Sequence, residues 1–223
     1  MELVSIAGLA GVPGLGLIQT MNTILNGFQT PWKVRNKLEC WIIYPWMRIL
    51  MAVNGIPWRQ GWSFYGVPII QKHHKSKISF GAGLSLRSSL RSNPLGVNHP
   101  VFVSTLRIGA VLEVGNNFAM TGGAICAADS IRIADNVVIG ANSTIIDTDF
   151  HPIDSALRRL HPQDGRTVPV VIEDNVFIGM NCLILKGVTL GAGSVISAGS
   201  IVTKAMPPRI IAAGNPAKVL RAL

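Results

Sequence analysis

Residues 171–203 read VIEDNVFIGMNCLILKGVTLGAGSVISAGSIVT, and one pattern recurs in them every six residues. A large aliphatic residue opens each repeat: Ile172, Ile178, Ile184, Leu190, Ile196 and Val202. A period of six fits neither an α-helix nor a half-buried strand. The pattern therefore predicts a solenoid, in which short strands bury an apolar face against copies of one another.

Asparagine or glycine stands three places after each of the first five aliphatic residues: Asn175, Asn181, Gly187, Gly193 and Gly199. These two residue types tolerate a positive φ with the least strain. We therefore expect the chain to turn a corner once in every six residues.

The same spacing predicts earlier rungs of the solenoid, although it is less regular there. The rung residues expected on this basis are Ile78, Leu84, Leu90, Ile108, Val114, Met120 and Cys126. Two stretches break the pattern, 91–105 and 147–169. The first is rich in turn-forming residues, and the second is polar and holds two of the five histidines. Because insertions in a solenoid commonly form its binding face, we expect the active site at 147–169.

Net charge and hydropathy are unevenly distributed. The formal charge is +9, and residues 1–77 hold eight Lys or Arg against Glu2 and Glu39. The stretch Leu3 to Trp32 carries no charged residue, and a second apolar run from Leu38 to Val53 contains two Trp and one Tyr. No interleaving of basic and stacking aromatic residues along one surface is apparent, so we expect no nucleic-acid partner.

An apolar, aromatic and basic segment is typical of a bilayer interface, so residues 1–60 predict association with a membrane surface. Two alternatives remain open. One is a true membrane span, and the other is a helical cap over the first coil of the solenoid. We expect an N-terminal extension at 1–62 and a solenoid domain at 63–223.

The hexads resemble those of the hexapeptide-repeat acyltransferases, and the resemblance covers roughly residues 66–221. It implies an all-β fold, a left-handed parallel β-helix with three hexads per coil, to which the apolar N-terminal helical extension is added. The left hand comes from the resemblance alone, because general chirality rules favour the opposite one. The resemblance also implies a homotrimer with active sites shared between neighbouring chains.

The segment Asp149-Phe150-His151-Pro152-Ile153-Asp154 lies in the second break. Histidine suits general base catalysis near neutral pH. An equivalent His-Pro motif carries the base in sugar acetyltransferases of this family, so the resemblance assigns that role to His151. Asp149 and Asp154 are expected to orient the ring, with solvated loop carboxylates as the alternative. A histidine satisfied within the loop is the alternative for His151.

The resemblance implies acetyl-CoA as the acetyl donor, held along the C-terminal rungs between neighbouring chains. A run of the form AGS-V-TK and a following basic tail carry this likeness. The donor residues expected from it are Phe177, Met180 (through its backbone N–H), Ala198, Thr203, Lys204, Lys218 and Arg221. Lysine and arginine suit the CoA phosphates, although Lys218 and Arg221 could also form a solvated basic tail.

Residues that contact the acceptor are expected at Asn98, His99 and Thr121. Thr121-Gly122-Gly123 stands where galactoside and maltose acetyltransferases carry a sugar-binding asparagine. The chain is more similar here to acetyltransferases of exopolysaccharide and capsule synthesis. No rung position holds histidine, so we expect no metal site; zinc carbonic anhydrases with this fold place three imidazoles around one metal.

These features predict O-acetylation of a sugar in a surface polysaccharide or in its lipid-linked precursor. The expected location is cytoplasmic, at the inner face of the cytoplasmic membrane. N-acetylation of an amino sugar and a non-catalytic β-solenoid scaffold remain the alternatives.

Overall fold

The computed structural model describes residues 29–223. The greater part of the first apolar run, proposed to contact a membrane, lies in 1–28 and so outside the described residues. Over 29–223, no helix is both long and apolar enough to cross a bilayer. The chain divides into two compact units, Met1–Leu38 and Glu39–Leu223, and the second contains the β-helix.

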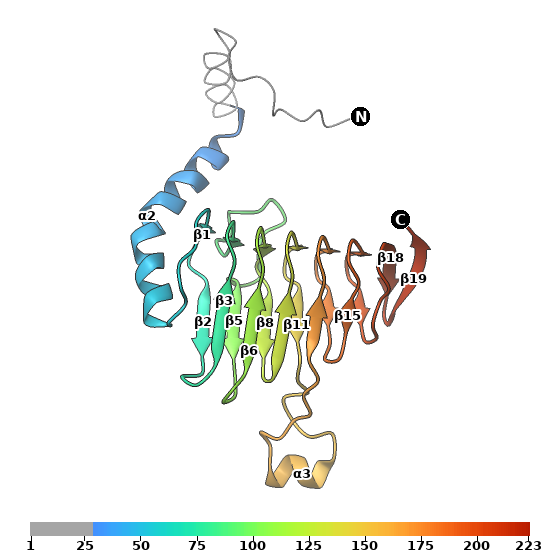
Figure 1. Cartoon of the computed structure of the whole chain (residues 1–223). Helices are drawn as coiled ribbons and strands as arrows, with labels where there is room; N and C mark the ends of the chain where they lie inside the picture. Colours follow the sequence, from blue (N-terminus) through green and yellow to red (C-terminus); the bar gives the residue numbers. More distant parts are fainter. Residues whose placement is uncertain (1–28) are drawn as a thin grey trace. The chain divides into compact units, whose positions relative to one another are not determined.

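The strands form three sheets that we call walls A, B and C (Figure 1). Wall A has the order β1 (Ser63–Tyr65), β4 (Ser85–Arg87), β7 (Ala119–Thr121), β10 (Val138–Ile139), β13 (Phe177–Ile178), β16 (Val195–Ile196), β18 (Ile210–Gly214) and β19 (Ala217–Ala222). Wall B has the order β17 (Ile201–Val202), β14 (Leu183–Ile184), β11 (Thr144–Ile146), β8 (Ala124–Ala127), β5 (Phe102–Thr105) and β2 (Ile69–Lys72). Wall C has the order β15 (Thr189–Leu190), β12 (Val170–Ile172), β9 (Ser130–Ile133), β6 (Val111–Val114) and β3 (Lys77–Phe80).

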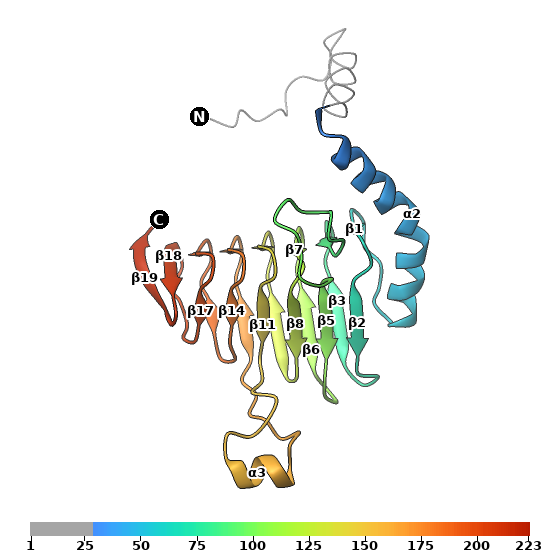
Figure 2. The same ribbon diagram turned by 180° about the vertical axis from the view of Figure 1, so that it is seen from behind.

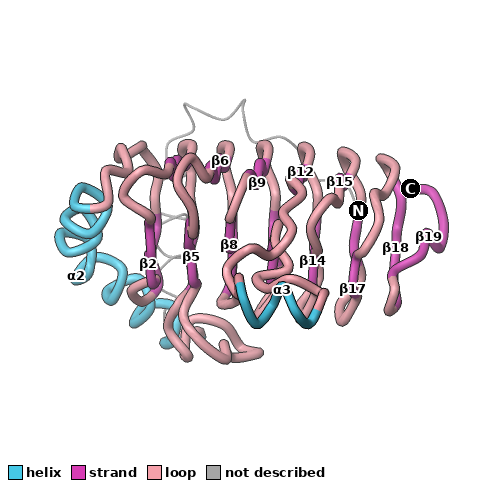
Figure 3. Tube along the Cα trace, turned by 90° about the horizontal axis from the view of Figure 1, so that it is seen from below, coloured by secondary structure: helices cyan, strands magenta, loops and turns pink. Residues whose placement is uncertain are grey.

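Up to β17, neighbours within a wall are three strands apart in the chain, so each coil supplies one strand to each wall. The ladders are parallel, except that β18 and β19 form an antiparallel hairpin at the C-terminal end. Seen from below in Figure 3, the coils follow one another along a single axis. This arrangement fits a left-handed parallel β-helix.

The hexads of 171–203 form the core as predicted. The side chains of the six repeat-opening residues, Ile172 to Val202, have no exposed surface. Equivalent residues stack on each other along the axis, as Ile145, Ile184 and Val202 do in wall B. The five corner residues adopt φ values between 54° and 76°. The prediction of a turn once per hexad is therefore confirmed.

The earlier rungs differ from the prediction in three places. Leu90 and Ile108 are exposed, because they lie in turns rather than in strands. Ile125, not Cys126, pairs with Ile145 in the stacked position. In this half of the protein several strands are four residues long, as in β5 and β8, so a strict period of six does not hold. The predicted 91–105 loop also ends early, because β5 begins at Phe102.

Helix α2 (Pro31–Val53) precedes the first coil. It ends at Val53, and Gly55 in the following turn has a φ of 64°, with the Ile56 N–H donating to the Met51 carbonyl. This is a Schellman cap, in which glycine supplies the left-handed residue. From Glu39 onward the helix belongs to the β-helix unit, and it contributes Met47 and Met51 to the core.

Candidate functional site

Loop 147–169 leaves the β-helix between β11 of wall B and β12 of wall C. Its two arms run antiparallel, because Thr148 bridges Thr167 and the Asp149 N–H donates to the Arg166 carbonyl at 3.0 Å. Short helix α3 (Ser155–Leu160) lies at the tip of the loop (Figure 1). The segment predicted to hold the active site is therefore a two-armed loop that projects from the β-helix.

Asp147 anchors the base of this loop. Its carboxylate is fully buried and accepts hydrogen bonds from the Ala128 and Asp129 N–H groups at 2.7 and 2.8 Å. Burial raises the pKa of Asp147, and the backbone hydrogen bonds only partly oppose this effect. Asp147 therefore ties the loop to the turn after β8, one rung toward the N-terminus.

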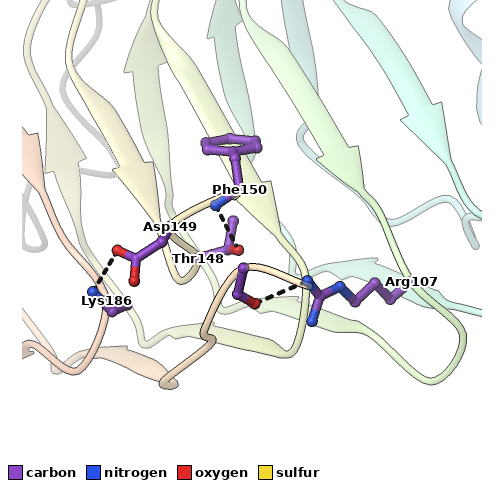
Figure 4. Close-up of polar contacts among 6 residues, drawn as sticks. Arg107, Thr148, Asp149, Phe150 and Lys186 are labelled. Carbon is purple, nitrogen blue, oxygen red and sulfur yellow. Dashed lines mark hydrogen bonds and ion pairs between the residues drawn. The ribbon is translucent and has the colours of Figure 1, made fainter. Parts of the chain in front are cut away.

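Asp149 links the loop to the next rung toward the C-terminus. Its Oδ1 lies 2.5 Å from Nζ of Lys186, which follows β14 (Figure 4). The Asp149 Oδ2 atom is buried and has no hydrogen-bond partner within 29–223. The structure thus gives Asp149 an ion pair with the wall, whereas the sequence had suggested contact with the histidine ring.

The His151 side chain is exposed, and its orientation is defined by the loop itself. Its Nδ1 lies 2.6 Å from the Pro162 carbonyl oxygen. Because a carbonyl can only accept, Nδ1 carries a proton, and in the neutral ring Nε2 then keeps its lone pair. No partner of Nε2 is found in the described part of the chain. The loop therefore satisfies one ring nitrogen and leaves the other available as a base.

Asp154, the second carboxylate beside His151 in sequence, caps α3. Its side chain accepts a hydrogen bond from the Leu157 N–H at 2.8 Å, which satisfies an otherwise unpaired helix N–H. The Pro162 carbonyl, rather than this carboxylate, orients the ring.

The residues predicted to bind acetyl-CoA fall into two groups. Phe177 lies on wall A, and Met180 and Ala198 lie in consecutive turns between walls A and B, which we call the A–B corner. Met180 accepts a hydrogen bond from the Gly199 N–H, so the two turns are stacked. Lys218 and Arg221 lie on β19, at the end of wall A.

Thr203 and Lys204 belong to the other group. They follow β17 at the B–C corner, the set of turns that ends the strands of wall B. The loop with His151 leaves this same corner after β11, and Lys186 follows β14 between them. The B–C corner therefore gathers the candidate base and two cations on successive rungs.

The residues predicted to contact the acceptor lie at the A–B corner. Thr121 is buried at the end of β7, and the Asn98 N–H donates to Asn142 Oδ1 at 2.8 Å. Nδ1 of exposed His99 lies 2.7 Å from the Pro100 carbonyl oxygen. Figure 2 shows the loop 88–101, in green, at the opposite end of the wall B strands from α3. Within one chain, wall B thus separates these residues from His151.

A groove of about 530 Å³ lies on wall C and on the turns that follow its strands, away from both the A–B and the B–C corner. Glu113, Glu173 and Asp174 are among its lining residues, so its acidic surface does not suit the phosphates of CoA. Among the residues that the structure describes, no group of three or more His, Cys, Asp or Glu is placed to hold a metal ion.

Four features of the site were missed by sequence reasoning. They are the Lys186 ion pair, the Pro162 carbonyl, Gly165 and Arg107. Lys186 lies in a regular hexad, where a lysine is an ordinary surface residue. The role of the Pro162 carbonyl could not be predicted, because every residue has a backbone carbonyl.

The comparisons with known proteins agree with this fold. The family model described as "Hexapeptide repeat of succinyl-transferase" matches residues 169–204. Galactoside O-acetyltransferase of Escherichia coli is 40% identical over 126 residues, which cover 56% of this chain and 59% of that protein. The enzyme of the same name from Lactococcus lactis is 42% identical over 91 residues, 41% of this chain and 42% of that protein. The chain thus spans about half the length of these curated relatives.

A structural neighbour supports the fold alone. It is AntD, an N-acyltransferase from Bacillus cereus in complex with dTDP and 3-hydroxybutyryl-CoA. It superposes with a TM-score of 0.59 at 15% identity, over 79% of this chain and 87% of that one. With the sixfold repeat and the O-acetyltransferase relatives, these observations show that the chain is similar to the hexapeptide-repeat acetyltransferases.

Proposed function

We propose that this protein transfers an acetyl group from acetyl-CoA to a hydroxyl of a sugar, in a surface polysaccharide or its lipid-linked precursor. The proposal rests on the geometry of His151, an exposed residue whose Nδ1 lies 2.6 Å from the Pro162 carbonyl oxygen and whose Nε2 has no partner within 29–223. The O-acetyltransferase relatives support the choice of acetyl-CoA and of a hydroxyl acceptor.

In the proposed reaction, Nε2 of His151 takes the proton from the acceptor hydroxyl as its oxygen attacks the thioester carbonyl carbon. The C–S bond then breaks, and the departing thiolate takes the proton back from Nε2. No acyl-enzyme forms. The Met180 N–H, which has no acceptor within 29–223, is proposed to donate to the thioester oxygen, and nearby cations are proposed to bind the CoA phosphates.

We further propose a homotrimer in which the B–C corner of one chain faces the A–B corner of the next. The supporting observation is the separation by wall B of His151 from Met180, Ala198 and Thr121 within one chain. A groove between two chains would bring His151 of one chain to Met180, Ala198 and Thr121 of the other.

Replacing His151 by alanine tests the role of the base. We expect kcat to fall about 10²- to 10⁴-fold, with little change in the KM for acetyl-CoA, because general base catalysis contributes on this order. The matched control is His161→Ala, which removes another exposed histidine of the same loop. Thiol release would be measured with extracted lipid-linked oligosaccharides as acceptor. An unchanged rate for His151→Ala would remove this residue from the mechanism.

The product distinguishes the transferred linkage. We expect a mass gain of one acetyl group that is lost on mild alkaline treatment, because esters hydrolyse under conditions that amides survive. An alkali-stable acetyl group would indicate N-acetylation instead.

We also propose that the protein binds the inner face of the cytoplasmic membrane. On α2, Trp41, Ile42 and Trp46 are 65%, 78% and 58% exposed, and Lys33, Arg35 and Lys37 lie in the first turns of the same helix. Exposed aromatic residues beside cations suit a bilayer with anionic lipid.

Replacing Trp41, Ile42 and Trp46 together by serine tests the membrane proposal without removing Met47 and Met51 from the core. The wild-type protein is expected to sediment with vesicles that contain phosphatidylserine, and the triple variant is expected to stay in the supernatant. Val138→Ser, which alters an exposed apolar residue on β10, is the control. Equal sedimentation of wild-type protein and triple variant would contradict the proposal.

A further inference from the structure

We infer that Arg107 is a positioning residue for His151, a role that rests on the proposed function of His151 as the base. Arg107 lies in the turn after β5, far from the His-Pro motif in sequence. Its Nη2 donates to the Gln163 and Gly165 carbonyls of the loop at 2.7 and 2.9 Å. Figure 4 draws one of these two contacts. The guanidinium therefore fastens the returning arm of the loop to the β-helix.

The segment held by Arg107 is the one that orients the imidazole ring. Pro162, whose carbonyl accepts the Nδ1–H of His151, directly precedes Gln163. Fixing the Gln163 and Gly165 carbonyls thus fixes the acceptor that selects the tautomer of His151. Without that acceptor, no contact found in the described chain would keep the proton on Nδ1.

Backbone strain next to His151 makes this support necessary. Phe150 has a φ of 60°, and the His151 N–H donates back to the Asp149 carbonyl at 2.6 Å, in a three-residue turn. A bulky residue in this region is strained, and such conformations persist only where the surroundings hold them. The Phe150 N–H bond to Thr148 Oγ1, at 3.0 Å, supplies one such restraint.

Gly165 supplies a second restraint, and Arg107 holds it in place. A Cβ on Gly165 would lie 2.5 Å from the Phe150 carbonyl carbon and 2.6 Å from the His151 nitrogen. The returning arm therefore packs directly against the strained peptide, which only glycine allows. Arg107 binds the carbonyl of this same glycine, so it supports both the ring acceptor and the backbone turn.

A comparison of Arg107→Met with Arg159→Met, which removes an exposed arginine from α3 of the same loop, tests this role of Arg107. The first readout is the ¹⁵N spectrum of the histidine rings at alkaline pH, with His151 assigned by difference from His151→Gln. In the wild type we expect His151 to carry its proton on Nδ1. In Arg107→Met we expect a mixture with the Nε2–H form, and in Arg159→Met the wild-type spectrum.

The second readout is kinetic. Arg107→Met should lower kcat about ten- to a hundredfold with a nearly unchanged KM for acetyl-CoA, as expected when a supporting group of a catalytic side chain is lost. Arg107→Lys should keep most of the activity, because one nitrogen makes both bonds and a lysine ammonium carries three donors. Circular dichroism with thermal unfolding checks that each variant is folded.

Gly165→Ala disturbs the same peptide from the other side and should give the same mixture of tautomers, so the inference does not depend on one variant. A wild-type tautomer in folded Arg107→Met would overturn it. The spectrum is independent of turnover. If His151→Ala proved active, the proposed base would fail, while the tautomer would still report whether Arg107 orients the ring.

Discussion

The ion pair between Lys186 and Asp149 should control how firmly the loop 147–169 is held. For two charges 2.5 Å apart, an effective dielectric constant of about 20 gives roughly 7 kcal/mol of attraction before desolvation is counted. Both side chains are about three-quarters buried, so desolvation offsets much of this value. Charge-assisted hydrogen bonds of this kind contribute about 1.5–3 kcal/mol net.

Lys186→Met would remove this contribution and leave a largely buried carboxylate, one oxygen of which already lacks a partner among residues 29–223. Because the contact joins a loop to a rigid wall, we expect local opening rather than global unfolding. A loss of about 1.5–3 kcal/mol corresponds to roughly ten- to a hundredfold faster amide exchange in the loop.

Hydrogen–deuterium exchange followed by mass spectrometry on peptides from 147–169 measures this effect. Peptides from the rungs that flank the loop, such as 176–184, should exchange as in the wild type. Lys186→Arg serves as the control, because it keeps the charge. The double variant Lys186→Met/Asp149→Asn should exchange more slowly than Lys186→Met, because no unpaired charge remains. Additive effects of the two changes, or unchanged exchange in Lys186→Met, would refute the reasoning.

Two further predictions concern the core. Ile184→Ala should lower the free energy of unfolding by about 2–5 kcal/mol, because Ile184 is fully buried. Leu183→Ala, on the outward face of the same strand, should lower it far less. Urea denaturation measures both free energies, and equal losses would contradict the inward stacking of Ile184. Cys40, Cys126 and Cys182 are free and buried, so a thiol reagent should count almost no thiols in the native protein near neutral pH and three after denaturation. Burial raises the pKa of Cys126 and Cys182, which lowers the fraction of each thiol present as reactive thiolate near neutral pH. Rapid labelling of the native protein would contradict the burial of these cysteines.

The sequence was informative wherever one side chain fills one position of a rung. Ile184 is fully buried and must be apolar, and Asn181 turns a corner with a φ of 54°. At such positions the residue type predicts the place of the side chain in the rung. The sixfold spacing failed to predict the buried residues of the early coils, because several strands there are longer and a strict period of six no longer holds. Leu90 there is apolar in sequence but 68% exposed in the structure.

The candidate site was predicted in part, and the missing part has a physical cause. His151 could be found because histidine chemistry and its neighbours mark it. Its partner could not, because the Pro162 carbonyl is a backbone group whose position depends on the fold of the loop. Arg107 follows β5, two rungs along wall B from β11, after which the loop begins. Only the three-dimensional path of the loop brings Gly165 to Arg107.

The central claim is that His151 of one chain acts together with Met180 and Ala198 of its neighbour, and mixing two inactive variants tests it. One variant is His151→Ala, and the other is Ala198→Trp, which places a large side chain on the exposed A–B corner and should block the donor groove. Random mixed trimers made by refolding equal amounts together should regain about a quarter of wild-type activity, because one in four interfaces then pairs two intact halves. No recovery above either variant alone, with mixed trimers confirmed by native mass spectrometry, would contradict the account.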